Sequence, residues 1–148
     1  MSTATVTLQR VLRAPPERVY RAFLDADALA KWLPPQGYTG QVHELDARVG
    51  GRHRMTFRNF SGRGGHDFGG EYLELVPGSL IRYTDQFDDP NLPGVIEVKV
   101  ELQSVICGTE LRITQSGLPA AIPLAMCYLG WQESLNQLAH LVEPNIPG

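Results

Sequence analysis

The longest hydrophobic pattern in the chain runs over residues 119–142 and has the period of an α-helix. Six apolar positions recur at alternating spacings of four and three residues, which places them on one stripe of such a helix. The second half has a polar opposite face and should lie half-buried, whereas Ala121 to Leu129 is apolar on almost every side and should be more enclosed. Pro144 ends the helix. The stripe consists of Leu124, Tyr128, Trp131, Leu135, Leu138 and Val142.

Three shorter elements are predicted near the start of the chain. Residues 5–12 have a β-rich composition and partial alternation, which Val11 breaks. A helix opens at residues 15–17, because prolines and a glutamate suit a first turn. A second short helix spans Ala26 to Trp32, with Asp25 as its N-cap and prolines after it. The inward side chains of these elements are Val6, Leu8, Val19, Tyr20, Phe23, Leu24, Leu29, Trp32 and Leu33.

Several strands separated by Gly, Pro and Asp turns are predicted between the two helical regions. Alternation is clearest in residues 95–102, as a sheet with one wet face requires. Residues 59–70 are so rich in glycine that we expect a mobile hairpin loop and no continuous strand. This order predicts an α+β fold in which a curved antiparallel sheet wraps around the terminal helix. The predicted strands are residues 40–47, 51–60, 70–76, 80–87, 94–104 and 109–115.

The length of 148 residues suits one domain, and composition narrows the classes of partner. Cys107 and Cys127 match no zinc or redox spacing, so we expect free thiols and a cytoplasmic protein. A net charge of -3 argues against nucleic-acid binding, and no apolar run is long enough to insert in a membrane. The local exception is a basic run, in which Arg52, Arg54 and Arg58 share one strand parity and are interpreted as a solvated strand face in preference to an anion site. Its members are Arg48, Arg52, His53, Arg54, Arg58 and Arg63.

A set of short motifs, weak singly but specific in order, resembles the bacterial relatives of the Hsp90 ATPase activator, a branch of the START-like (Bet v 1-like, SRPBCC) superfamily. The resemblance implies the helix-grip fold, with two short N-terminal helices, and a hydrophobic cavity for ligands such as lipids, polyketides or aromatic compounds. The eukaryotic activator has a separate N-terminal domain for its chaperone contact with no counterpart here, so Hsp90 activation is not expected. The motifs lie at residues 14–23, 29–32, 50–52, 70–77, 108–111 and 130–131.

Aromatic and apolar residues with inward parity are the candidates for lining that cavity, since pockets for apolar ligands have such walls and a few polar groups. Ordinary core packing is the alternative; it is favoured for Trp131 and stays open for Trp32, Tyr83 and Tyr128. His53 and Asp85 are candidate polar anchors, although a satisfied core histidine and a strand-end aspartate are the favoured interpretations. The predicted lining is Trp32, Phe57, Tyr83, Phe87, Val98, Val100, Gln115, Leu124, Tyr128 and Trp131.

The sequence contains no recognisable catalytic motif. His66 and Asp67 are adjacent in sequence, which does not orient an imidazole for proton transfer, and Glu71 stands alone. The histidines are scattered, so neither a metal site nor a cofactor is expected. Three functions remain: binding or carrying a small hydrophobic ligand, which we favour, a cyclase- or dehydratase-type enzyme, and a protein-interaction module marked by an exposed apolar patch. A homodimer stays open.

Two further expectations concern the terminal helix. Gly130 lies inside it, where glycine costs about 1 kcal/mol relative to alanine, so we expect its missing side chain to permit a close contact with the sheet or a ring. A ligand is expected to reach the cavity between the Trp32 region, residues 59–70 and the first half of the helix. Val98→Trp should then fill the cavity.

Overall fold

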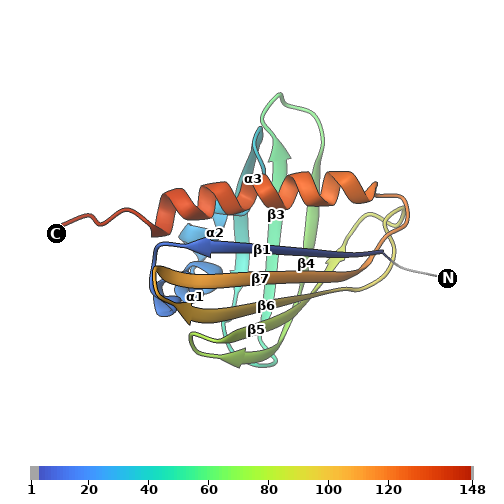
Figure 1. Cartoon of the computed structure of the whole chain (residues 1–148). Helices are drawn as coiled ribbons and strands as arrows, with labels where there is room; N and C mark the ends of the chain where they lie inside the picture. Colours follow the sequence, from blue (N-terminus) through green and yellow to red (C-terminus); the bar gives the residue numbers. More distant parts are fainter. Residues whose placement is uncertain (1–3, 148) are drawn as a thin grey trace.

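Neighbouring strands of the chain pair antiparallel in sequence order, and the first strand joins the last (Figure 1). The computed structural model describes residues 4–147. Its seven-stranded sheet has the order β1-β7-β6-β5-β4-β3-β2. This is the predicted α+β helix-grip architecture. The elements are β1 (Ala4–Leu12), α1 (Pro16–Leu24), α2 (Ala26–Trp32), β2 (Tyr38–Leu45), β3 (Arg52–Asn59), β4 (Gly65–Val76), β5 (Leu80–Phe87), β6 (Ile96–Val105), β7 (Gly108–Leu118) and α3 (Leu124–Val142).

The sheet is strongly curved, and α3 runs along β1 on the side that the strands enclose (Figure 1). Strands β3 and β4 rise behind the helix at a steep angle to β1, β7 and β6. Helices α1 and α2 close one end of this arrangement. The Asp25 carboxylate accepts a hydrogen bond from the Ala28 N–H at 2.9 Å, so it caps α2 as predicted.

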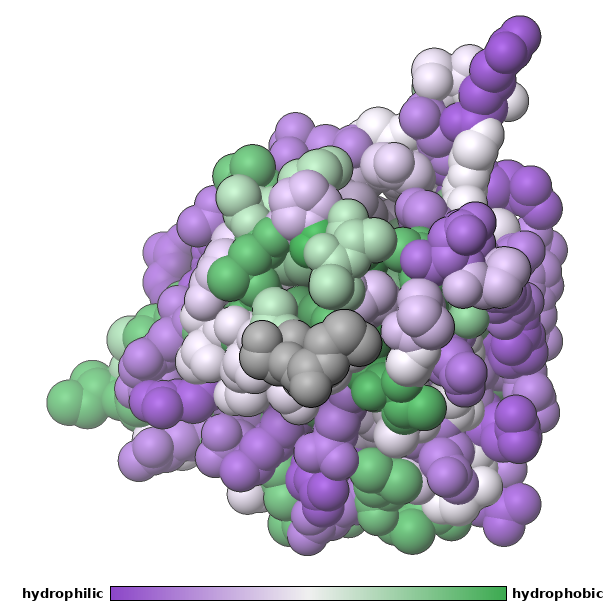
Figure 2. Space-filling model, turned by 90° about the vertical axis from the view of Figure 1, so that its right-hand side faces the viewer, coloured by the Kyte–Doolittle hydropathy of each residue, from purple (hydrophilic) through white to green (hydrophobic). Residues whose placement is uncertain are grey.

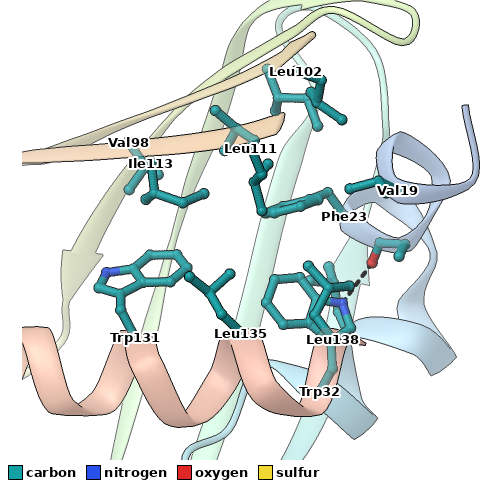
Figure 3. Packing of buried hydrophobic residues seen from close by; sticks show 14 of the residues in the cluster. Val19, Phe23, Trp32, Val98, Leu102, Leu111, Ile113, Trp131, Leu135 and Leu138 are labelled. Carbon is teal, nitrogen blue, oxygen red and sulfur yellow. Dashed lines mark hydrogen bonds between the residues drawn. The ribbon is translucent and has the colours of Figure 1, made fainter. Parts of the chain in front are cut away.

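The second half of α3 packs its apolar stripe against the concave face of the sheet. These side chains are buried, and each contributes about 1.5–3 kcal/mol through removal from water. Trp32 lies in the same core, with its ring edge toward Phe23 and its indole N–H donating to the Ala22 carbonyl at 2.8 Å. Figure 3 shows the facing side chains, which are Trp131, Leu135 and Leu138 from α3 and Val98, Leu111 and Ile113 from the sheet.

The first half of α3 is exposed, which contradicts the expectation that it would be the more enclosed half. Leu124, Met126 and Leu129 keep 41%, 63% and 58% of their surface exposed. Figure 2 views the molecule from the end where α3 begins and shows hydrophobic residues (green) gathered on this surface. The physical reason is that this half of the helix borders an open pocket, so its inward side chains meet no filled core.

The glycine-rich segment is mostly strand, so the predicted long loop is wrong. β4 begins at Gly65 and pairs with β3 up to Glu71, and Gly70 lies opposite His53. Gly69 and Gly70 are needed for close backbone approach: a Cβ on Gly70 would lie 2.0 Å from the Thr84 carbonyl oxygen. Glycine here indicates a tight curved sheet, and only residues 60–64 form the turn.

The prediction that Arg52, Arg54 and Arg58 lie on a largely solvated face of β3 is confirmed, whereas His53 of the same run is buried. Arg52 and Arg58 are exposed, and the half-buried Arg54 forms an ion pair with Asp88 at 2.6 Å.

Within residues 4–147, no helix is long and apolar enough to cross a membrane.

Candidate functional site

An open pocket of about 480 Å³ lies between the first half of α3, the segment that follows α2, and the concave face of strands β3–β7. Pockets for small ligands typically have roughly 300–1,000 Å³. The segment after α2 contributes Leu33, Pro35 and Gln36, and Tyr38 follows at the start of β2. The pocket is therefore bounded by parts of the chain that are far apart in sequence.

The strand side of the pocket is aromatic. Phe57 and Phe68 pack edge to face with ring centroids 4.9 Å apart, and Phe68 lies 6.0 Å from Phe87. Trp131 closes the helix side, and its indole N–H donates to the Gln115 side-chain oxygen at 2.9 Å. Edge-to-face packing and this hydrogen bond hold the rings in fixed orientations, so the wall is largely preformed.

Asp85 is the unusual polar group of the pocket. It lies on β5 between Tyr83 and Phe87, and residues two apart on a strand point to the same face. Only 16% of its side chain is exposed, and its Oδ1 is a buried atom with no hydrogen-bond partner. Burial raises the pKa of Asp85 from 3.8 to about 8, because the charged form loses water and gains no compensating donor. The carboxyl is therefore protonated at neutral pH.

His53 lies behind Asp85 but does not satisfy it. The Nε2–H of His53 donates to the Thr84 carbonyl at 2.9 Å, which fixes the tautomer, while Asp85 Oδ1 is 3.6 Å away. Burial lowers the pKa of His53, so the ring is neutral and supplies no positive charge. Tyr72 and Tyr83 pack against the ring with centroids 5.3 Å away, and burial raises the pKa of both phenols. The surroundings of Asp85 are therefore uncharged.

Hydrogen bonds join α3 to the segment after α2 and hold the rim of the pocket. The Ser134 hydroxyl donates to the Leu33 carbonyl at 2.6 Å, and the Gln137 amide donates to the carbonyls of Trp32 and Pro34. The Glu133 carboxylate accepts from the Gln36 N–H at 3.2 Å. These bonds place α3 at a fixed distance from the opposite wall.

Two other reactive residue types border the pocket without an evident chemical role. Burial raises the pKa of the half-buried Cys127, which keeps it a thiol and a poor nucleophile. His66 packs against Phe87 at 5.5 Å. Among the residues that the structure describes, no three His, Cys, Asp or Glu side chains lie where they could hold a metal ion. The geometry suits binding of an apolar molecule against one buried carboxyl group.

Comparison with family models matches residues 13–143 to the family described as Activator of Hsp90 ATPase homolog 1-like protein. This match covers most of the chain. The protein belongs to this family. A comparison of the AHSA1-like chain with curated proteins found no match.

Solved structures agree with this assignment. A crystal structure of a protein from Chromobacterium violaceum is 60% identical over 95% of this AHSA1-like chain and 98% of its own, with a TM-score of 0.94. An AHSA1-like protein from Aeromonas hydrophila, solved by NMR, is 23% identical over 95% of this chain and 92% of its own, with a TM-score of 0.76. A Rhodobacter sphaeroides protein is 21% identical over 93% and 90%, with a TM-score of 0.80. The last two show the fold alone.

About half of the residues that the sequence predicted to line a cavity or to act as its polar anchors do line the pocket of this AHSA1-like protein. Those that line it are Phe57, Tyr83, Asp85, Phe87, Gln115 and Trp131. Trp32, Val98 and Val100 do not line it, because they are fully buried in the filled core between the second half of α3 and the sheet. The pocket therefore lies beside Leu33 and Gln36, which follow Trp32 in the chain, while Trp32 itself does not border it.

Three further residues of the predicted set also lie outside the lining. Leu124 is exposed in the first turn of α3 and does not border the pocket. Tyr128 is half-buried, and its hydroxyl accepts a hydrogen bond from the Thr7 N–H at 3.4 Å. His53 is buried, packs against Tyr72 and Tyr83, and does not border the pocket. The periodicity of the sequence predicts which side chains point inward, but it does not distinguish those that line the pocket from those that pack in the core.

Several lining residues escaped the sequence reasoning. Phe68 was missed because residues 59–70 were interpreted as a loop, although its strand parity matches that of Phe87 across β4 and β5. Ile96 shares the inward parity of Val98 but lies at the strand end, where the pocket begins. The expected close contact at Gly130 is wrong: a Cβ there would meet nothing within 4 Å, because the residue faces the pocket.

Proposed function

We propose that the protein binds a small hydrophobic molecule in this pocket. The observation that carries the proposal is an open, preformed aromatic space of about 480 Å³ that borders the side chain of Asp85, a carboxyl group whose buried Oδ1 has no partner. Filling the space would remove aromatic surface from water, and a polar group on the ligand could satisfy Asp85. Membership of the family and the fold are consistent with a ligand-binding domain.

Tryptophan fluorescence provides the test, because the two tryptophans lie in different environments. Trp131 borders the pocket, whereas Trp32 is sealed in the core and bonded to Ala22. Titration with flat apolar compounds should change the emission, and Trp131→Phe should remove the change while Trp32 still emits. Native mass spectrometry of freshly purified protein should show a retained molecule. A wild-type protein that responds to no apolar compound would contradict the proposal.

A matched pair of variants separates pocket binding from surface adsorption. Gly130→Phe should place a ring in the pocket, where nothing obstructs its Cβ, and should abolish the response without unfolding the chain. Gln132→Phe adds the same ring to an exposed position of α3 outside the lining and should bind normally. Val98→Trp is unsuitable for this purpose, because Val98 is fully buried in the filled core.

An enzyme of the cyclase or dehydratase type is a second candidate, favoured by the raised pKa of Asp85. General acid–base groups work best when their pKa lies near the working pH, and Asp85 has a pKa of about 8 in an apolar pocket. The same titrations distinguish the two functions. Recovery of a chemically altered compound, lost in Asp85→Asn, would favour catalysis over binding.

A further inference from the structure

The pocket is bordered by two carboxyl groups and, among residues 4–147, by no lysine or arginine. The two carboxyl groups are those of Asp85 and Glu133. Among the described residues, His66 is the one histidine of the lining, and it lies on the exposed hairpin beside Phe87. A ligand with a carboxylate would therefore bring a negative charge toward Glu133 and, if Asp85 ionised, toward a second carboxylate, and it would meet no lysine or arginine among the described lining residues. The pocket disfavours fatty acids and other anionic apolar molecules.

We propose that the pocket recognises an apolar amine, whose ammonium group lies beside the Asp85 carboxylate and among the aromatic rings. This rests on the proposed function, since it names the chemical class of the ligand that the pocket would bind. Two independent features of the structure support it, namely the unpartnered carboxyl oxygen and the rings on either side of it.

The first feature is that Asp85 lacks a donor from the protein. Its nearest basic group, His53, gives its Nε2–H to Thr84 and stays 3.6 Å from Oδ1. The other titratable groups near it are the phenols of Tyr72 and Tyr83. An ammonium group supplies both a hydrogen-bond donor and a positive charge, so it can pair with the 16% of the Asp85 side chain that stays exposed and favours the ionised carboxylate. A neutral hydroxyl would supply only the donor.

The second feature is the arrangement of rings around the carboxyl. Tyr83 and Phe87 flank Asp85 on the same face of β5, and Phe68 packs beside Phe87 from β4. Aromatic faces attract cations, and such attraction is strongest where water is excluded. Ring faces and a carboxylate together are a set of groups suited to an ammonium ion, while the apolar remainder of the ligand would contact Phe57, Ile96 and Trp131.

Binding of an ammonium would also release a proton. In the free protein the Asp85 carboxyl holds its proton at neutral pH, because burial raises its pKa to about 8. When a protonated amine binds, the carboxyl loses that proton to solvent and the ammonium keeps its own, so the pair is carboxylate and ammonium. One proton leaves for each amine bound. A neutral alcohol bound at the same place would release none.

Three probes of one shape test the proposal: phenylbutylamine, phenylbutanol and phenylbutyric acid, titrated calorimetrically into the full chain at one pH. We expect the amine to bind at least about tenfold more tightly than the alcohol, and the acid most weakly, as expected for a desolvated charge pair. Repeating the amine titration in buffers with different ionisation enthalpies should reveal the released proton. This measurement uses the wild-type protein and needs no variant.

Asp85→Asn provides the specific variant, and Asp89→Asn the control, because Asp89 is exposed and outside the pocket lining. The Asp85 variant should lose about tenfold in amine affinity and keep its alcohol affinity within about twofold, whereas the control should match wild type. Equal affinities for amine and alcohol, absence of proton release, or tightest binding of the acid would overturn the amine proposal while leaving the binding function intact. Failure of all three probes and of other apolar compounds would instead contradict the binding function itself.

Discussion

Asp85 is an ionisable group in a position that opposes its ionisation. Its Oδ1 is buried without a partner, and His53, the nearest base, is engaged with Thr84. Leaving a buried polar atom unsatisfied typically costs about 1–3 kcal/mol, so the Asp85 side chain lowers the stability of the free protein. Such a group on an apolar wall is a reason to assign the pocket a binding role.

The pH dependence of stability should reveal this carboxyl. The folded chain keeps the proton up to about pH 8, whereas the unfolded chain loses it near the ordinary pKa of 3.8. Between these values the folded state binds more protons, so the free energy of unfolding falls as pH rises. Asp85→Asn should remove this fall, with a limiting effect of about 1.4 kcal/mol for each unit of pKa difference. Chemical denaturation at a series of pH values measures it.

His53 contributes a dependence of stability on pH that has the opposite sign. This contribution is present both in the wild-type protein and in the Asp85→Asn variant. Burial lowers the pKa of His53, so the unfolded state takes up the proton first and stability falls as pH drops through the ordinary histidine value of 6.5. Subtracting the free energy of unfolding of the wild type from that of the Asp85 variant at each pH removes this contribution. The difference should grow steadily with pH and level off above about 8. A difference that does not change with pH would mean that Asp85 titrates normally in the folded chain.

At the scale of the element, two glycines show how one residue type has opposite roles in a strand and a helix. In β4, Gly70 allows the chain to approach β5, whose Thr84 carbonyl lies where a Cβ would be. That carbonyl also accepts the His53 hydrogen bond, so the close approach helps to fix the groups behind Asp85. In α3, Gly130 faces open space and only weakens the helix.

Replacing each of these glycines by alanine should therefore change stability in opposite directions. Gly70→Ala should lower the free energy of unfolding by about 1–3 kcal/mol, because the methyl group meets a backbone oxygen that cannot move freely. Gly130→Ala should raise it by up to about 1 kcal/mol, because the helix gains alanine's propensity. Denaturant midpoints measure both. A destabilised Gly130→Ala would show that the helix has a close neighbour there after all.

At the scale of the whole molecule, α3 is the element that joins the two ends of the chain. Its buried stripe fills the concave face, and polar contacts along it reach β1 and α1. Asn136 accepts a hydrogen bond from Arg10, and the Val142 carbonyl accepts one from Arg18 at 3.0 Å. The exposed first half adds little burial, so the stabilising contacts are concentrated between Trp131 and Val142.

Truncation after Leu118 should accordingly abolish cooperative unfolding. It removes four buried side chains worth about 1.5–3 kcal/mol each, against a total stability of about 5–15 kcal/mol for a domain. Those side chains are Trp131, Leu135, Leu138 and Val142. Thermal melting followed by circular dichroism measures the effect. Truncation after Glu143 is the control, because residues 144–147 are exposed, and it should melt like the full chain. A cooperative melt of the shorter chain would contradict the central role of α3.

Periodicity determined the elements whose burial is regular. The stripe from Trp131 to Val142 is buried as predicted, and the bounds of α2 and β5 agree with the expected residues. These features follow from local geometry, because a helix or a strand sorts side chains by spacing alone. The polar position of Asp85 on the inward face of β5 was likewise predictable from its parity with Tyr83.

Tertiary structure alone decided which inward-facing residues border the pocket and which pack in the filled core. Val98 and Gln115 lie opposite each other on paired strands, yet Val98 is in the filled core and Gln115 borders the pocket. Sequence spacing gives the face of an element but not its distance from the facing layer. That distance depends on the curvature of the sheet, which the close approach of β4 and β5 at Gly70 helps to set, and on the placement of α3. The sequence by itself therefore determined the two layers, and only their packing created the pocket between them.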